Sequence, residues 1–104
     1  MSTQGLRIDE KSRKVWVDGK LMPEKLAKNE EKFVRYLSSR HGAICLRAEV
    51  VLAVYGKAYD RSDDERLDAM VGRIRRKIGD KERPHRFLIT EHRQGHRLLG
   101  YIDE

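Results

Sequence analysis

Residues 62–78 read SDDERLDAMVGRIRRKI and place two opposed faces on one helix. An apolar stripe recurs at i, i+4, i+7 and i+11, the spacing of a helix packed on a core: Leu67, Val71, Ile74 and Ile78. Ser62 and Glu65 match a capping box, and Gly79-Asp80 is a stop signal, so we expect a helix over 62–78. The other side of the wheel gathers Arg66, Ala69, Met70, Arg73, Arg76 and Lys77, with Arg75 on its flank.

Upstream of this helix the pattern predicts a small antiparallel sheet and two further helices. Residues 6–8, 15–17 and 20–22 are β-type runs, and Asp18-Gly19 between the last two is a strong hairpin signal. Helical spacing then begins at Asn29 and ends near 41, before Gly42. A second, short helix is expected over 47–55, with Gly56 ending it.

Downstream, two β-type runs over 87–90 and 97–99 flank a polar segment, which predicts a terminal hairpin. A sheet, three helices with a tight turn between the last two, and a closing hairpin make an α+β winged helix-turn-helix. At 104 residues the chain suits one domain over 1–104, with a core from about 6 to 101.

The charge is concentrated in one third of the chain. The formal net charge is +6, and residues 66–97 alone hold 10 Arg and Lys against four acids. A dense, mostly Arg segment is suited to binding a polyanion, because guanidinium pairs with phosphate through two parallel hydrogen bonds. The alternative interpretation is a charged face that is only solvated and binds no partner.

Other function classes have little support in the sequence. It has no Gly-rich phosphate loop, nucleophile elbow or catalytic carboxylate pair, so we expect no enzyme and no cofactor. His85, His92 and His96 with the single Cys45 lack the spacing of a metal site. No apolar run is long enough for a membrane span or a signal peptide, so we expect a cytoplasmic protein.

Three stretches resemble the OmpR/PhoB-type winged-helix effector domain of bacterial response regulators. They are RAEVVLAVYG (47–56), DERLDAMVGRIRRKI (64–78), and Ile89-Thr90 with GHRL (95–98). The resemblance implies a four-stranded N-terminal sheet, a third helix in the major groove of double-stranded DNA, and a wing over 90–97 at the minor groove. It also implies two-component regulation of transcription, RNA polymerase as a partner of the 56–62 loop, and a weak homodimer on tandem half-sites.

Site residues follow from the resemblance and from the basic stripe. Position by position, the resemblance implies recognition-helix contacts at Arg66, Met70, Arg73 and Arg75, phosphate contacts at Arg47 and Tyr55, and wing contacts at Thr90 and His92. Within the helix, Arg73 is our choice for a base edge, guanine by preference, because it is central on the expected exposed face. The basic stripe and the wing tip complete the predicted DNA-binding set with Arg76, Lys77 and Arg93.

The wing departs from the family pattern at three positions. The family usually has Arg, Gly and Tyr where this chain has His92, Arg93 and His96, and commonly Arg where it has Gly72. These changes leave an alternative from another class, a degenerate winged helix that acts as a protein–protein interaction module. The intact basic stripe opposes that alternative.

Overall fold

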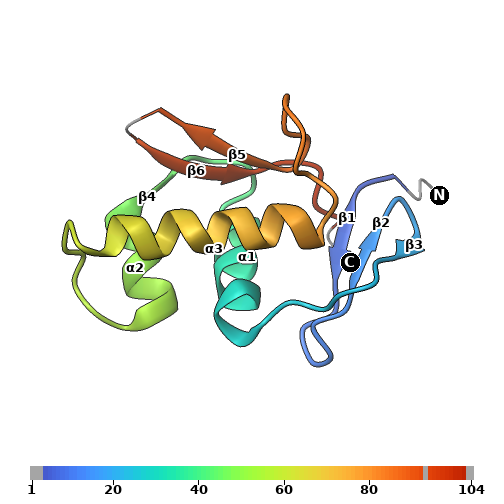
Figure 1. Ribbon diagram of the computed structural model, residues 1–104, viewed down its shortest axis with the longest axis horizontal. Coiled ribbons are helices and arrows are strands. Elements are labelled where there is room, and N and C mark those ends of the chain that lie inside the picture. Colours follow the sequence, from blue (N-terminus) through green and yellow to red (C-terminus); the bar gives the residue numbers. More distant parts are fainter. Residues whose placement is uncertain (1–3, 93, 103–104) are drawn as a thin grey trace.

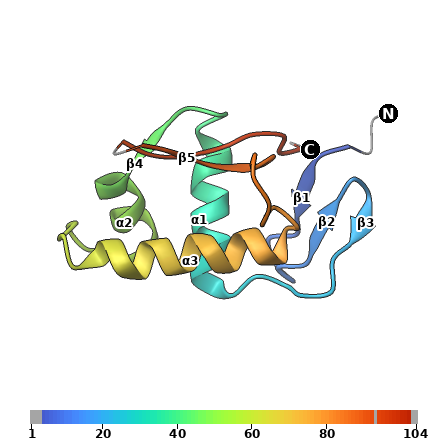
Figure 2. The ribbon, with the colours of Figure 1, turned by 45° about the horizontal axis from the view of Figure 1, so that its top comes forward.

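A computed structural model describes residues 4–92 and 94–102. The third helix crosses the front of the molecule in Figure 1, with the first helix behind it and the second beside its N-terminal half. A small sheet lies beyond the C-terminal end of the third helix (Figures 1 and 2). A hairpin formed by the last two strands runs alongside the third helix. This arrangement confirms the α+β winged helix-turn-helix. The elements are β1 (Leu6–Ile8), β2 (Val15–Val17), β3 (Lys20–Leu21), α1 (Lys28–Ser39), β4 (Cys45–Leu46), α2 (Arg47–Tyr55), α3 (Asp63–Lys77), β5 (Leu88–Glu91) and β6 (Gly95–Leu98).

The N-terminal sheet is antiparallel, in the order β1-β2-β3. Asp18 and Gly19 form its hairpin turn with φ of 53° and 81°, as the sequence predicted. The four strands implied by the resemblance are wrong for the described residues, since this sheet has three. An isolated parallel bridge between Leu6 and Tyr101 lies beside β1, fixed by the Leu6 N–H donating to the Gly100 carbonyl at 2.8 Å.

Two helix starts differ from the sequence prediction. Helix α1 begins at Lys28, one residue before the expected Asn29, and the Ala27 N–H donates to Glu30 Oε1 at 2.9 Å. Helix α3 begins at Asp63, and the expected capping box is wrong because the Ser62 hydroxyl donates to Asp60 at 2.6 Å. In its place the Asp63 carboxylate accepts the Asp60 N–H at 2.9 Å.

The wing is the outer part of a second sheet with the strand order β4-β6-β5. Strand β5 lies one residue later than the predicted run over 87–90. Strand β6 begins at Gly95, two residues before the predicted run over 97–99, and ends one residue before the end of that run. The buried carboxylate of Asp80 accepts the N–H groups of Phe87 and Leu88 at 3.0 and 2.8 Å. Because Asp80 lies only three residues after the end of α3, it ties the end of the helix to the start of β5.

None of the helices in the described part of the chain is long and apolar enough to cross a membrane.

One core lies between the three helices and the two sheets. Buried apolar side chains come from every layer: Leu6, Ile8, Val15, Leu26, Phe33, Val34, Leu37, Cys45, Val50, Val54, Leu67, Met70, Val71, Ile74, Ile78, Phe87, Leu88 and Leu98.

His96 of β6 is buried in this core. Its side chain is 1% exposed and stands edge-on to Phe33, with 5.7 Å between ring centroids. Burial, together with the charges of Arg47 and Arg75, lowers the pKa of His96 to about 4. The imidazole is therefore neutral in the folded protein at neutral pH.

We expect His96 to make the protein less stable in acid. The unfolded chain binds a proton at His96 near pH 6.5 and the folded chain only near pH 4, so stability falls as pH drops through this window. Between about pH 7 and pH 4.5, His96→Gln should remove about 2 to 3 kcal/mol of the pH dependence of the unfolding free energy. Urea denaturation at the two pH values measures it. His41→Gln, in an exposed turn, is the control, and an unchanged pH dependence in His96→Gln would contradict the prediction.

Candidate nucleic-acid interface

The surface of α3 opposite the core is its open face. One side of the helix is buried through Leu67, Val71 and Ile74, as the stripe predicted. Met70 is also fully buried, so its predicted place on the exposed face is wrong. It lies three residues after Leu67 and four before Ile74, a spacing that belongs to the apolar stripe. The exposed residues of α3 are Glu65, Arg66, Asp68, Ala69, Gly72, Arg73 and Arg76.

A buried carboxylate of α1 holds two of the predicted cations. Glu30 is 2% exposed and accepts from Arg73 Nε at 3.1 Å and from Lys77 Nζ at 2.7 Å. Burial alone would raise the pKa of Glu30, but the hydrogen bonds from Lys77, the Ala27 N–H and Arg73 outweigh it and hold the pKa below its usual value. Arg73 remains 48% exposed, whereas Lys77 is only 12% exposed. Lys77 therefore joins α1 to α3 and does not lie on the open face.

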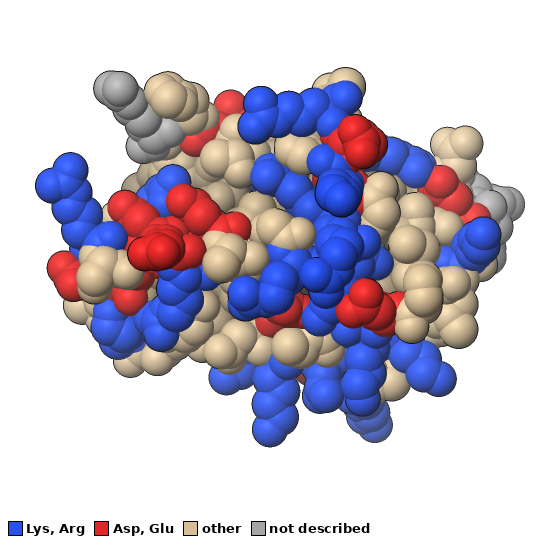
Figure 3. All heavy atoms as spheres, in the orientation of Figure 1, with Lys and Arg blue, Asp and Glu red and all other residues tan. Residues whose placement is uncertain are grey.

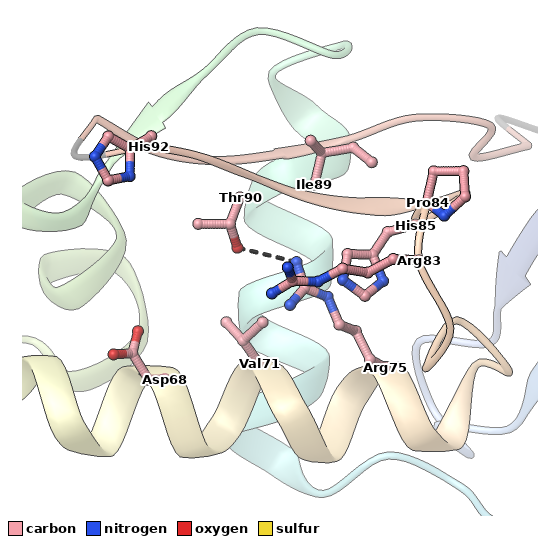
Figure 4. A pocket seen from close by; sticks show the side chains of 9 residues that line it. All are labelled: Asp68, Val71, Arg75, Arg83, Pro84, His85, Ile89, Thr90 and His92. Atoms are coloured by element: carbon pink, nitrogen blue, oxygen red, sulfur yellow. Dashed lines mark hydrogen bonds between the residues drawn. The ribbon is translucent and has the colours of Figure 1, made fainter.

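Arg75 connects α3 to the wing. Its guanidinium donates to the Leu88 carbonyl, at 3.1 Å from Nε and 2.9 Å from Nη2. Nη2 also donates to the Thr90 hydroxyl at 2.9 Å (Figure 4). Arg75, which the sequence analysis assigned to DNA contact, thus positions β5 and brings Thr90 close to α3.

The cations near the start of α3 are paired with its acids. Arg66 stacks over Tyr55, with 3.7 Å from its Cζ to the ring centroid, and donates to Asp63 at 2.8 Å. Arg47 donates to Asp64 at 3.0 Å and lies 3.6 Å from Asp68. These contacts bring Arg47, Tyr55 and Arg66 together at the N-terminal half of α3.

An open groove lies between α3 and the wing. It has a volume of about 550 Å³, and Arg75, Arg83 and His92 contribute to its lining from the helix, the connecting loop and the wing (Figure 4). Asp68 also lines it. Thr90 and His92 are exposed here, whereas the predicted contact at Arg93 lies outside the described residues.

Charge is uneven along α3. Figure 3 shows acidic side chains gathered near its N-terminal half, and Lys and Arg side chains over its C-terminal half and the loop that follows. Sequence reasoning missed Glu65, Asp68 and Gly72 on the open face and Arg83 beside it. A helical wheel that counts Met70 among the buried residues would have placed Glu65, Asp68 and Gly72 on the open face.

Comparisons with known proteins agree with this geometry. The family profile described as "Transcriptional regulatory protein, C terminal" matches residues 22–98. The fold is similar to that of the Klebsiella pneumoniae RstA DNA-binding domain in complex with the RstA box, with a TM-score of 0.77 and 23% identity over 94% of each chain. It is also similar to the DNA-binding domain of E. coli CpxR, with a TM-score of 0.71 and 20% identity over 94% of this chain and 93% of that one.

A third similar structure is the DNA-binding domain of Bacillus subtilis CssR, with a TM-score of 0.68 and 25% identity over 90% of this chain and 99% of that one. A search of curated proteins found no significant match.

Replacing Arg75 should loosen the wing. In Arg75→Met the aliphatic stem remains, but the Leu88 carbonyl and the Thr90 hydroxyl lose their charged donor, at a cost of about 1.5 to 3 kcal/mol of unfolding free energy. Urea denaturation measures the loss, and amide hydrogen exchange should quicken in β5. Arg76→Met is the matched control, because the ion pair of Arg76 with Glu24 at 3.4 Å is half-exposed and contributes little to stability. Equal stability of the two variants would contradict this role.

Gly72 weakens α3 without any packing reason. A Cβ added at Gly72 would meet nothing within 4 Å outside the local helix backbone. Gly72→Ala should therefore raise the unfolding free energy by about 1 kcal/mol, since Ala has the higher helix propensity. Thermal denaturation monitored by circular dichroism checks this prediction. A lower melting temperature than that of the wild type would show that the position is constrained.

Proposed function

The chain belongs to the family of C-terminal domains of transcriptional regulatory proteins, the OmpR/PhoB type, and from this premise we propose that it binds double-stranded DNA sequence-specifically as a regulator's effector domain. In the proposed complex, α3 occupies the major groove and the wing reaches the adjacent minor groove. The binding requires no cofactor and no catalysis.

The observation that carries the proposal is the open face of α3. Ala69 and Gly72 stand at its centre, so no long side chain keeps the helix axis away from a partner. A helix about 10 to 12 Å across fits a major groove about 12 Å wide. Arg66, Arg73 and Arg76 surround this centre with guanidinium groups that suit phosphates and base edges.

Arg73 is the proposed base-reading residue, and Glu30 is its support. Glu30 accepts from Nε of Arg73. Within the described residues, this leaves the two terminal nitrogens for the fork that pairs with O6 and N7 of guanine. A buried carboxylate behind the guanidinium fixes its direction, which favours a specific contact over a diffuse one.

The other predicted contacts take narrower roles. Arg66, Arg76, Arg47 and Tyr55 are proposed to face phosphates, and Arg47 would exchange Asp64 for a phosphate oxygen to do so. Thr90 and His92 are the proposed contacts of the wing. Arg75 and Lys77 act through the positions of β5 and α1, and Met70 takes no part in binding.

Three wider proposals rest on the family membership. The 56–62 loop is proposed to contact RNA polymerase, and its Lys57 and Tyr59 side chains reach back to Asp63 and Asp64, which fixes its shape. Two copies are proposed to pair weakly on tandem half-sites. The proposed place of action is the bacterial cytoplasm.

Binding to DNA is testable by its salt dependence. A duplex selected by the protein from a random pool should bind more tightly than an unselected duplex. With about five phosphate contacts, log K should fall against log salt with a slope near −4 to −5 between about 50 and 200 mM. Arg73→Ala should cost about 1 to 3 kcal/mol on the selected duplex and much less on the unselected one.

Arg66→Ala is the matched control, since it should weaken both duplexes alike. Fluorescence anisotropy provides the affinities. Salt-insensitive or undetectable retention of both duplexes would favour a protein-interaction module. Equal losses on both duplexes for Arg73→Ala would remove the base-reading role.

A further inference from the structure

Three exposed lysines lie beside the C-terminal half of α3. Lys25 precedes α1, and Lys28 and Lys32 lie on its first two turns. We call Lys25, Lys28 and Lys32 the lysine flank. In Figure 3, Lys and Arg side chains project from the lower edge of the molecule, where Figure 1 places the start of α1.

Three ion pairs, made by two carboxylates, fix the lysine flank against α3. Glu24 pairs with Arg76 at 3.4 Å, and Glu30 pairs with Arg73 and Lys77 at 3.1 and 2.7 Å. The segment that carries the three lysines is therefore clamped to the side of α3 that bears Arg73. Arg75 projects to the other side and holds the wing, so the lysine flank and the wing border opposite sides of the helix.

The acids of this segment are already engaged. Glu24 and Glu30 pair with α3, and Glu31 is 8% exposed, with an oxygen 3.7 Å from Arg35. In the part of the chain that the structure describes, no ion pair neutralises the lysine flank. Its charge therefore adds to that of Arg73 and Arg76.

Helix stability does not account for these lysines. Lys28 is the first residue of α1, where the macrodipole favours acids and disfavours cations. Lys28 and Lys32 are a like-charged i, i+4 pair, which destabilises a helix. Positive charge kept at a helix start against both effects is suited to an anionic partner.

We propose that the lysine flank binds the phosphates of the DNA strand that borders α3 on the side away from the wing. The proposal rests on the DNA-binding function proposed above and extends the interface from α3 and the wing to α1. DNA is favoured over an acidic protein because the flank continues the basic side of α3. Contacts of this kind raise affinity and salt sensitivity without reading sequence.

The test compares two double variants with the same net charge. Lys28→Gln/Lys32→Gln removes two charges from the flank, and Lys11→Gln/Lys20→Gln removes two exposed lysines of the N-terminal sheet and its turns. The flank variant should lower the magnitude of the salt slope by roughly 1 to 2 and weaken selected and unselected duplexes alike, on the order of tenfold at low salt. The control variant should keep the slope of the wild type.

Circular dichroism melting establishes that both variants fold, and the flank variant should melt no lower than the wild type. Equal slopes for the flank variant and the wild type would overturn the inference and leave an acidic protein partner as the occupant. Equal changes in both variants would overturn it too, since net charge alone would then explain the loss. Failure of the wild type to bind either duplex would instead reject the DNA-binding function itself.

Discussion

The buried carboxylate of Glu30 fixes how α3 lies on α1. It is 2% exposed and accepts from the Ala27 N–H, Arg73 and Lys77, so the start of α1 and the last two turns of α3 meet at one group. Removing one partner from a buried pair leaves an uncompensated charge, which costs several kcal/mol. Because its pKa is lowered, Glu30 is ionised at neutral pH, and its contribution to stability is lost only as acid protonates it.

Ion pairs within the protein also determine how DNA phosphates compete for the arginines of the interface. The arginines of α2 and α3 that are proposed to contact DNA each have a carboxylate partner within the protein, so DNA binding by most of them is an exchange of carboxylate for phosphate. Half-exposed pairs contribute about 0 to 1 kcal/mol, and counterion release offsets their loss. Arg73 differs because its buried partner Glu30 accepts only from Nε, so Arg73 keeps Glu30 and offers its terminal nitrogens. The pairs are Arg47–Asp64, Arg66–Asp63, Arg73–Glu30 and Arg76–Glu24.

Local signals in the sequence were enough to predict the architecture. The period of α3, the Asp18-Gly19 turn and the β-runs of the wing each depend on neighbours along the chain, and each is confirmed. The pairing of β4 with β6 and the three-strand limit of the first sheet depend on residues far apart, which no local pattern encodes. The candidate site was half predicted for the same reason. Charge marks a residue as polar, but whether Lys77 meets solvent or Glu30 is decided by a contact 47 positions away.

The interface therefore contains fewer available cations than its sequence suggests, and it is more rigid. Arg73, Arg75 and Lys77 alternate along the last turns of α3, so successive members point to opposite sides of the helix. Arg73 and Lys77 join α1 on one side, and Arg75 holds β5 on the other. Each anchor fixes an element that borders the open face, and Arg75 and Lys77 are withdrawn from that face, whereas Arg73 stays exposed on it. Because α1 and β5 are already fixed beside α3, DNA binding loses less conformational entropy in ordering them. This smaller entropy cost compensates for part of the charge that the anchors withdraw.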